Sequence, residues 1–143
     1  MYPFLIHFVI ALINNTLYEN EDHGIYATRS TNVTCTYNNI TANFEKGFEI
    51  TNTNKSKILY NEIINNGDDG VFLESFNDSE IINNTIINNG VLIFPTNLDH
   101  GISLSQTYNC IIENNSIFKS CGNGIYLGDS DNVVVTYNNI NDS

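Results

Sequence analysis

The stretch Gly70-Val71-Phe72-Leu73 decides the fold, because variants of it return along the chain at a nearly fixed spacing. Its glycine belongs to a series with spacings of 23, 23, 31 and 23 residues: Gly24, Gly47, Gly70, Gly101 and Gly124. Similar phrases follow the other glycines: Gly24-Ile25-Tyr26-Ala27, Gly101-Ile102-Ser103-Leu104 and Gly124-Ile125-Tyr126-Leu127. A period of this length is typical of a solenoid, in which each repeat is one coil stacked on the previous coil.

The repeat extends far beyond the glycines when residues are counted from each of them. The fourteenth residue after the glycine is always asparagine: Asn38, Asn61, Asn84, Asn115 and Asn138. The sixteenth is always isoleucine: Ile40, Ile63, Ile86, Ile117 and Ile140. The nineteenth is asparagine in three coils and then serine: Asn43, Asn66, Asn89 and Ser120. When the same count starts at residue 1, it predicts apolar residues at positions 12 and 17 and asparagine at positions 15 and 20, which are Leu12, Leu17, Asn15 and Asn20. We therefore expect about six coils, the last incomplete.

Each coil contains three short stretches of alternating apolar residues, at positions 1–4, 9–12 and 15–18 after the glycine. Alternation rich in β-branched residues, without a helical period, predicts strands. Equivalent strands of successive coils run in the same direction, so they form parallel sheets rather than hairpins. The sequence therefore predicts an all-β, single-stranded parallel β-helix with one sheet on each of three sides.

The asparagines of the fourteenth position have a structural role in this fold. They fall between the second and third strands, where the chain must bend, and asparagine tolerates the left-handed backbone region. Their amides can also bond to the same amide in the coils above and below, at the strand spacing of about 4.8 Å. We interpret Asn15 to Asn138 as an amide ladder, with a row of polar ligands as the alternative.

Two phrases carry a family resemblance: Asn83-Asn84-Thr85-Ile86-Ile87-Asn88-Asn89-Gly90 and Asn66-Gly67-Asp68-Asp69-Gly70-Val71-Phe72-Leu73. They resemble the right-handed parallel β-helix repeats of the NosD-like, pectin-lyase-like superfamily, over roughly residues 10–143. That superfamily includes polysaccharide lyases, glycoside hydrolases, alginate epimerases and large microbial surface proteins. The shared residues are those that build the coil, so the resemblance implies a right-handed helix and leaves the function open.

Composition excludes several partners. With 16 acidic and 5 basic residues the chain has a net charge of −11, which disfavours nucleic acid and anionic membranes. Cations, neutral glycans or a basic partner remain open. Three cysteines do not form a disulfide framework. Cys35 and Cys110 fall on inward positions and fit as small buried side chains, while a Cys110–Cys121 disulfide stays open.

We expect one β-helix domain over residues 1–143, with an inserted turn loop at about 91–98 that accounts for the 31-residue spacing. The apolar stretch Tyr2–Ile13 is too short to span a membrane and lacks a basic segment before it, so it fits a first coil. Neither end carries a recognisable polar cap. We expect a piece of a longer β-helix, extracellular or on the cell surface.

A column of acids stands two residues before four of the glycines: Asp22, Glu45, Asp68 and Asp99. Stacked carboxylates at about 4.8 Å repel by roughly 1 kcal/mol in water, so exposure, a lysine or a cation must compensate. Calcium is the cation that such an oxygen-rich loop column suits. The alternative is that Asp and His simply favour tight turns before glycine, with no cofactor at all.

The same column holds the candidate catalytic residues, Asp68, Asp69, Asp99 and His100, beside the inserted loop. In the enzymes of the resembling superfamily, acids and a histidine or basic residue gather outside the first sheet. The resemblance thus implies a lyase or epimerase site, with His100 abstracting a sugar proton and the acids or a cation neutralising a uronate. A hydrolase would instead use two carboxyl groups of adjacent coils.

The outward face of the first strands carries a further candidate site, formed by Tyr26, Glu49, Phe72, Glu74 and Tyr126. Aromatic rings interspersed with carboxylates can stack on sugar rings and bond their hydroxyls. Ordinary cross-strand aromatic packing is the alternative.

Three functions follow from these features. The leading hypothesis is a noncatalytic segment of an extracellular or cell-envelope β-helix protein, adhesin-like or carbohydrate-binding, because no catalytic constellation is complete. The second is a polysaccharide lyase, epimerase or glycoside hydrolase. Ice binding is the least favoured, because Thr34, Thr36 and Thr136 occupy only two coils.

Overall fold

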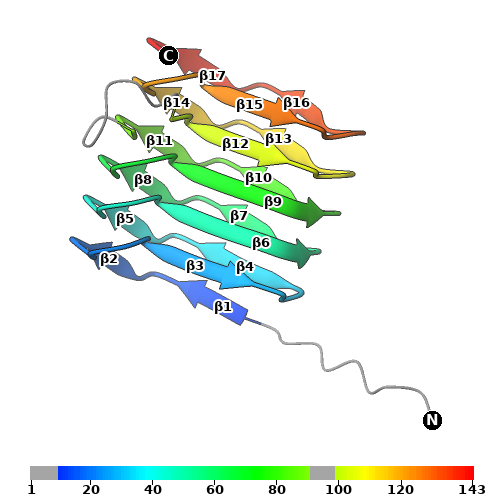
Figure 1. The fold of residues 1–143 in the computed structure, drawn as a ribbon, viewed down its shortest axis with the longest axis horizontal. Coiled ribbons are helices and arrows are strands. Elements are labelled where there is room, and N and C mark those ends of the chain that lie inside the picture. The colour runs from blue at the N-terminus through cyan, green and yellow to red at the C-terminus, as the bar shows by residue number, and fades with distance from the viewer. Residues whose placement is uncertain (1–9, 91–98) are drawn as a thin grey trace.

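A computed structural model describes residues 10–90 and 99–143, which form a stack of coils built from seventeen strands and no helix (Figure 1). Each coil contributes one strand to each of three parallel sheets. The first sheet contains β3 (Ile25–Thr28), β6 (Phe48–Asn54), β9 (Val71–Asn77), β12 (Ile102–Ser105) and β15 (Ile125–Gly128).

The other two sheets have six strands each. The second sheet contains β1 (Ile10–Ile13), β4 (Val33–Thr36), β7 (Lys57–Leu59), β10 (Glu80–Ile82), β13 (Ile111–Glu113) and β16 (Val134–Thr136). The third contains β2 (Thr16–Tyr18), β5 (Asn39–Thr41), β8 (Glu62–Ile64), β11 (Thr85–Ile87), β14 (Ser116–Phe118) and β17 (Asn139–Asn141). The strands of the first and third sheets begin at the predicted positions, whereas β7, β10, β13 and β16 begin one residue later than predicted. β6 and β9 are longer than expected, with seven residues each.

The register follows the sequence repeat from coil to coil. Ile25 pairs with Phe48 and Phe48 with Val71, each 23 residues further along the chain. Val71 then pairs with Ile102, so the 31-residue spacing leaves the register intact. In the described residues a partial coil of β1 and β2 is followed by the five coils of β3 to β17, the last of which contains 20 residues of the 23-residue repeat. The predicted loop at 91–98 lies outside the described residues.

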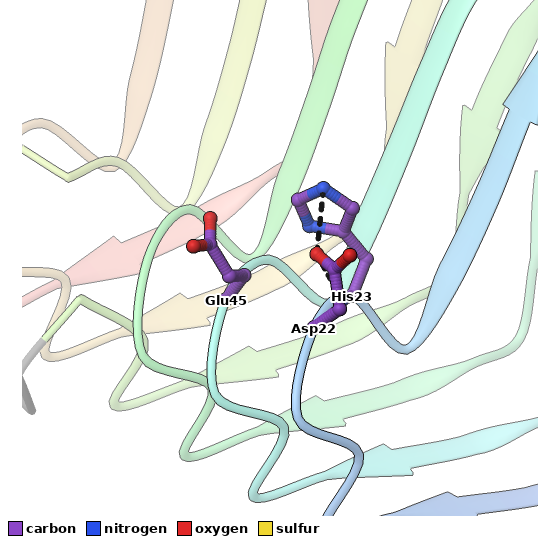
Figure 2. A group of neighbouring side chains, drawn as sticks. All are labelled: Asp22, His23 and Glu45. Atoms are coloured by element: carbon purple, nitrogen blue, oxygen red, sulfur yellow. Dashed lines mark hydrogen bonds and ion pairs between the residues drawn. The ribbon is translucent and has the colours of Figure 1, made fainter.

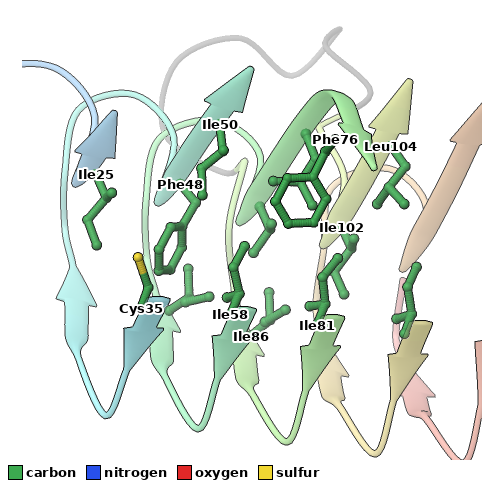
Figure 3. Close-up of a cluster of buried hydrophobic side chains, with 14 of the residues drawn as sticks. Ile25, Cys35, Phe48, Ile50, Ile58, Phe76, Ile81, Ile86, Ile102 and Leu104 are labelled. Atoms are coloured by element: carbon green, nitrogen blue, oxygen red, sulfur yellow. The ribbon is translucent and has the colours of Figure 1, made fainter. Parts of the chain in front are cut away.

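Inward-facing side chains fill the space between the three sheets in columns (Figure 3). Ile58, Ile81 and Ile112 of the second sheet are fully buried, as are Phe48 and Leu104 of the first. Each such side chain contributes roughly 1.5–3 kcal/mol by leaving water. Because one coil buries only four or five of them, the fold depends on coils stacking on each other.

The columns reach solvent in the coil of β15, β16 and β17. Leu127, Val135 and Ile140 occupy core positions in their strands, yet they are 43%, 42% and 45% exposed. In the preceding coil the equivalent Leu104, Ile112 and Ile117 are fully buried, because another coil covers them. Burial of each inward column thus depends on the coil that is stacked next to it.

The predicted amide ladder is present and lies inside the coil. Five side-chain bonds of 2.9–3.0 Å run from each Nδ2 to the next Oδ1 along Asn15, Asn38, Asn61, Asn84, Asn115 and Asn138. The backbone N–H of Asn61 donates to Asn84 Oδ1 as well, at 2.9 Å. The four central members are 1% exposed, so the ladder satisfies buried polar groups and is not a row of outward ligands.

The expected backbone role of these asparagines is wrong. The left-handed residue at this bend is the one before the ladder position, for example Tyr37, Tyr60 and Asn83, each with φ near 57°. In the part of the chain that the structure describes, all 22 non-glycine residues with positive φ fall into four such rows, at positions 5, 8, 13 and 18 after the glycine. The chain thus bends at several points per coil, and the ladder asparagine is chosen for its amide.

A second amide ladder runs along Asn20, Asn43, Asn66 and Asn89, with side-chain bonds of 2.6, 2.8 and 2.9 Å. It ends where the repeat substitutes serine. Ser120 Oγ is the buried side-chain polar atom that finds no hydrogen-bond partner in the described residues. The shorter side chain does not supply the acceptor that Asn89 offers to Asn66.

Buried thiols lie where the sequence predicts them. Cys35 and Cys110 are buried, and burial raises the pKa of the Cys35 thiol to about 12. The Cys110 thiol donates to the Phe76 carbonyl at 3.0 Å, and Cys110 is not paired with Cys121. Within residues 10–90 and 99–143, no helix is long and apolar enough to cross a membrane.

Candidate functional site

Two rows of side chains lie beside each other on the outside of the first sheet. The strip row is the outward position of the first strands, and the parallel register places its members over one another: Tyr26, Glu49, Phe72, Ser103 and Tyr126. The corner row is the residue immediately before each glycine: His23, Lys46, Asp69, His100 and Asn123. Because the corner between the third and first sheets turns tightly, the corner row can reach over the strip row.

His23 connects the two rows in the first complete coil. Its ring stacks on Tyr26 with centroids 5.8 Å apart and an angle of 21° between the planes. Nε2 lies 3.2 Å from Asp22 Oδ1 and 3.3 Å from Glu49 Oε2, while Nδ1 accepts the Lys46 backbone N–H at 3.3 Å. Both nitrogens are engaged, so the ring is held flat against Tyr26.

Lys46 forms the positive centre of the cluster. Its Nζ lies 2.9 Å from Asp68 Oδ2 and 3.2 Å from Glu49 Oε2, and 5.2 Å from the centre of the Phe72 ring. Burial opposes the charge, but the two carboxylates raise the pKa of Lys46 above its ordinary value. The lysine is thus a charged group already neutralised by its neighbours.

Asp69 is a buried carboxyl, 6% exposed, in the middle of the corner row. Its Oδ1 accepts the backbone N–H of His100, and its own N–H donates to Asp68 Oδ1 at 2.7 Å. Burial raises the pKa of Asp69 to about 7, and the charges of Asp68 and Asp99 act in the same direction. Near neutral pH this carboxyl is therefore partly protonated.

Asp68 and Asp99 form a carboxyl pair between successive coils. Burial, and then the negative charge of Asp68, raise the pKa of Asp99 to about 6. Burial opposes ionisation of Asp68 too, but the Lys46 ammonium lowers the pKa of that carboxyl below its usual value. The pair therefore divides into an ionised Asp68 and an Asp99 that holds its proton to higher pH.

His100 makes the same kinds of contact near one end of the strip row that His23 makes near the other end. Its ring stacks on Tyr126 with centroids 4.8 Å apart and an angle of 7°, and Nδ1 accepts the Asn123 backbone N–H at 2.9 Å. Burial lowers the pKa of His100, so the imidazole is neutral at pH 7. The His100 ring faces Tyr126, whereas the Asp99 carboxyl interacts with Asp68.

The four acids predicted for calcium do not act as one group. Ligand atoms of Asp22, His23 and Glu45 lie within 4.8 Å of one another (Figure 2). Asp68 is engaged by Lys46, and Asp99 by Asp68. A group with an imidazole nitrogen suits zinc or copper better than calcium. Asp22 is 79% exposed, however, and His23 is already held by two carboxylates, so calcium binding by the acid column stays a prediction.

The structure brings together most residues that the sequence singled out. Asp68, Asp69, Asp99 and His100 lie in one cluster with Lys46, and the strip row lies alongside. Glu74 is half-buried two positions beyond Phe72 on β9.

Sequence reasoning missed the two histidine–tyrosine stacks. The signal in the sequence was a histidine directly before the repeat glycine together with a tyrosine two residues after it. His23 and Tyr26 belong to the same coil, whereas His100 and Tyr126 belong to successive coils.

Comparison with known families decides the classification. The family model described as "Right handed beta helix region" matches residues 10–86 and 56–143, which together cover nearly the whole chain. The chain belongs to the right-handed β-helix family. The match extends over all the described coils of this β-helix, in agreement with the structure.

Solved structures share this β-helix fold. The A-module of the mannuronan C-5 epimerase AlgE4 from Azotobacter vinelandii matches with a TM-score of 0.83 at 20% identity. A mutant of the periplasmic alginate epimerase AlgG matches with a TM-score of 0.74 at 16% identity, and the Dettilon tailspike protein with 0.70 at 16%. These likenesses show the fold alone, because the sequence identity is low in all three.

The β-helix spans only part of each neighbour. The match covers 92% of this chain and 40% of the AlgE4 module. It covers 91% of this chain and 33% of AlgG, and 91% of this chain and 30% of the tailspike protein. No curated protein sequence matches the chain.

Proposed function

We propose that this chain is a noncatalytic, glycan-binding segment of an extracellular or cell-envelope β-helix protein. One observation carries the proposal: the strip row has an exposed tyrosine at each end, and each tyrosine is held by a stacked histidine. Tyr26 is 59% exposed and Tyr126 is 44% exposed. In each stack the histidine covers one face of the tyrosine and holds the ring in place, and an aromatic surface left exposed on a protein suits the apolar face of a sugar.

The spacing of the two platforms suits a polymer rather than a single sugar. Tyr26 and Tyr126 are four coils apart, which is about 19 Å at a strand spacing of about 4.8 Å. Between them lie the Phe72 ring, the Glu49 carboxylate, which is paired with His23 and Lys46, and Ser103, which is buried. The carbohydrate-active neighbours, an alginate epimerase among them, support a glycan as the ligand.

Binding of oligosaccharides to the variants Tyr26→Ala and Tyr126→Ala tests this function. Each substitution should weaken binding about tenfold, because it removes one stacking platform. Tyr108→Ala is the matched control, since Tyr108 is 49% exposed and lies outside both rows. Unchanged binding in both variants, or equal loss in the control, would refute the proposal.

A specific observation favours an enzyme as the second candidate. Asp69 and Asp99 have pKa values of about 7 and about 6 and lie in one cluster with the neutral imidazole of His100. Such groups can exchange protons with a substrate at neutral pH. Product release from alginate, pectin or a related polymer, abolished by His100→Ala and by Asp99→Asn, would establish a lyase, epimerase or hydrolase and overturn the noncatalytic role.

A further inference from the structure

A second surface feature lies at the corner between the second and third sheets, away from the strip row. A shallow groove of about 210 Å³ is lined by Tyr37, Asn38, Asn39, Tyr60 and Glu62. These residues come from two successive coils, where β4 turns into β5 and β7 turns into β8. The first sheet carries none of them, so this groove is independent of the candidate site described above.

Two tyrosines form one wall of the groove. The Tyr37 and Tyr60 rings stack with centroids 5.1 Å apart and planes within 8° of parallel. They are 58% and 47% exposed, so a large part of the aromatic surface remains in contact with water. The stack therefore forms a rigid aromatic edge that spans two coils.

The backbone at this row does not favour tyrosine. Tyr37 and Tyr60 both have φ of 57°, and the same row holds Asn14, Asn83 and Asn114 in other coils. Asparagine adopts the left-handed region readily, whereas a bulky aromatic residue is uncommon there. The left-handed backbone is a feature of this corner in every coil, and tyrosine occupies it at Tyr37, Tyr60 and Tyr137, of which the first two line the groove.

The rest of the lining offers one hydrogen-bond donor and one acceptor. Asn39 Oδ1 accepts the Thr41 hydroxyl, which orients the amide and leaves its Nδ2 as a donor. Glu62 is paired directly with Asn39 across the strands and is exposed. Within the described ranges its carboxylate makes no hydrogen bond or ion pair, so it remains available as an acceptor.

We infer that this groove binds one neutral sugar ring of a glycan. The exposed part of the two tyrosine rings suits the apolar face of a pyranose, while an amide donor and a carboxylate acceptor suit its hydroxyls. The groove is smaller than the pockets that hold drug-sized ligands, so it accommodates one ring rather than several. An acidic sugar is disfavoured, because Glu62 and the net charge of −11 repel it.

The variants Tyr37→Asn and Tyr60→Asn test the site without threatening the fold, because asparagine already occupies this row in three coils. The probes are cellotetraose and maltotetraose, with an alginate tetramer as the anionic comparison. The readout is the NMR shift of the Asn39 side-chain amide during titration. We expect a dissociation constant on the order of millimolar for a neutral probe, weakened about tenfold in either variant.

Tyr137→Asn is the matched control, since Tyr137 belongs to the same row but lies outside the groove. It should leave the titration unchanged, as should Tyr126→Ala in the strip row. The inference is overturned if neither neutral probe shifts the Asn39 amide, if the two groove variants bind normally, or if the alginate tetramer binds better. It is also overturned if the shift follows protein concentration alone, which would assign the groove to a second copy of the chain.

Discussion

At Gly47 the coil has no room for a side chain. A Cβ atom there would lie 2.5 Å from the Gly70 carbonyl oxygen and 2.5 Å from Ile63 Cγ2. The same isoleucine contact of 2.3–2.6 Å recurs at the four equivalent glycines, and none of the five has positive φ. The repeating glycine is therefore required by close packing between coils and not by a special backbone conformation.

Gly47→Ala should lower the free energy of unfolding by about 1–3 kcal/mol, because a backbone carbonyl and a buried isoleucine must both move. Urea unfolding followed by circular dichroism measures it. Gly128→Ala is the control, since its nearest contact is the Tyr126 ring at 3.1 Å, an exposed side chain that can shift. Equal losses in the two variants would contradict this account of the repeat.

Asp69 makes stability depend on pH. Its folded-state pKa of about 7 lies above the ordinary value of 3.8, so the folded chain binds more protons than the unfolded chain between about pH 4 and 7. Stability should fall as pH rises through this window, with Asp99 adding to the loss up to about pH 6. Asp69→Asn cannot ionise and keeps an acceptor for the His100 N–H, so it should be the more stable protein at pH 8.

The expected gain at pH 8 is at least about 1 kcal/mol, and it should vanish near pH 4. Thermal or urea unfolding at the two pH values gives the comparison. Asp131→Asn serves as the control because Asp131 is exposed and its carboxyl accepts only the neighbouring Asn132 N–H at 2.8 Å. A wild-type protein with flat stability from pH 4 to 8 would contradict the burial of Asp69.

The strands and the amide ladder could be predicted from the sequence, but the side-chain partners at the corner could not. The identity of every ladder residue follows from spacing, since Asn61 must lie over Asn84 once the coil length is known. The stacking of His100 on Tyr126 depends on how the corner folds back, which spacing does not encode. For the same reason the sequence placed Asp99 and His100 together, while their side chains meet different neighbours.

At the scale of an element, the two amide ladders act as polar cores parallel to the apolar one. Each internal asparagine accepts from the coil before it and donates to the coil after it, so a single substitution affects three coils. The second ladder is interrupted at Ser120, whose hydroxyl is left without a partner in the described residues. Asparagine, which the repeat has at this position in the four preceding coils, should therefore stabilise the ladder if it replaces Ser120.

Ser120→Asn should raise the free energy of unfolding by about 1 kcal/mol, by supplying an acceptor to Asn89 and satisfying a buried polar group. Asn66→Ser is the reciprocal change, because it creates the same interruption inside the ladder. It should cost about 1–3 kcal/mol, since Asn43 would lose both of its bonds to Asn66 Oδ1. Denaturant unfolding of both variants tests the pair. If both changes shift stability in the same direction, the ladder does not act as described.

For the whole molecule, stability depends on what lies on either side of each coil. A residue in a central coil is covered from two sides, whereas the coil of β15, β16 and β17 is covered from one. Ile112 and Val135 occupy the same column, and they are 0% and 42% exposed. The stack therefore has a gradient of burial that the repeat sequence alone does not show.

Ile112→Ala should cost about 2–5 kcal/mol in the 143-residue chain, as expected for a cavity in a closed core. Val135→Ala should cost less than about 1 kcal/mol, because its side chain is nearly half in water already. Hydrogen exchange should show the same order, with the amides of β16 opening before those of β13. Comparable costs for the two substitutions would show that the coil of β15, β16 and β17 is covered in solution.

Pairing continues unbroken across the 31-residue spacing, where Val71 meets Ile102 and Ile86 meets Ile117 as though no residues had been added. Chain length at this corner is therefore uncoupled from the architecture. A lineage of such proteins can lengthen, shorten or replace the connecting segment there while every rung of the scaffold keeps its neighbour. New specificities can thus accumulate beside an unchanged frame, and an engineer can graft peptides at the same place.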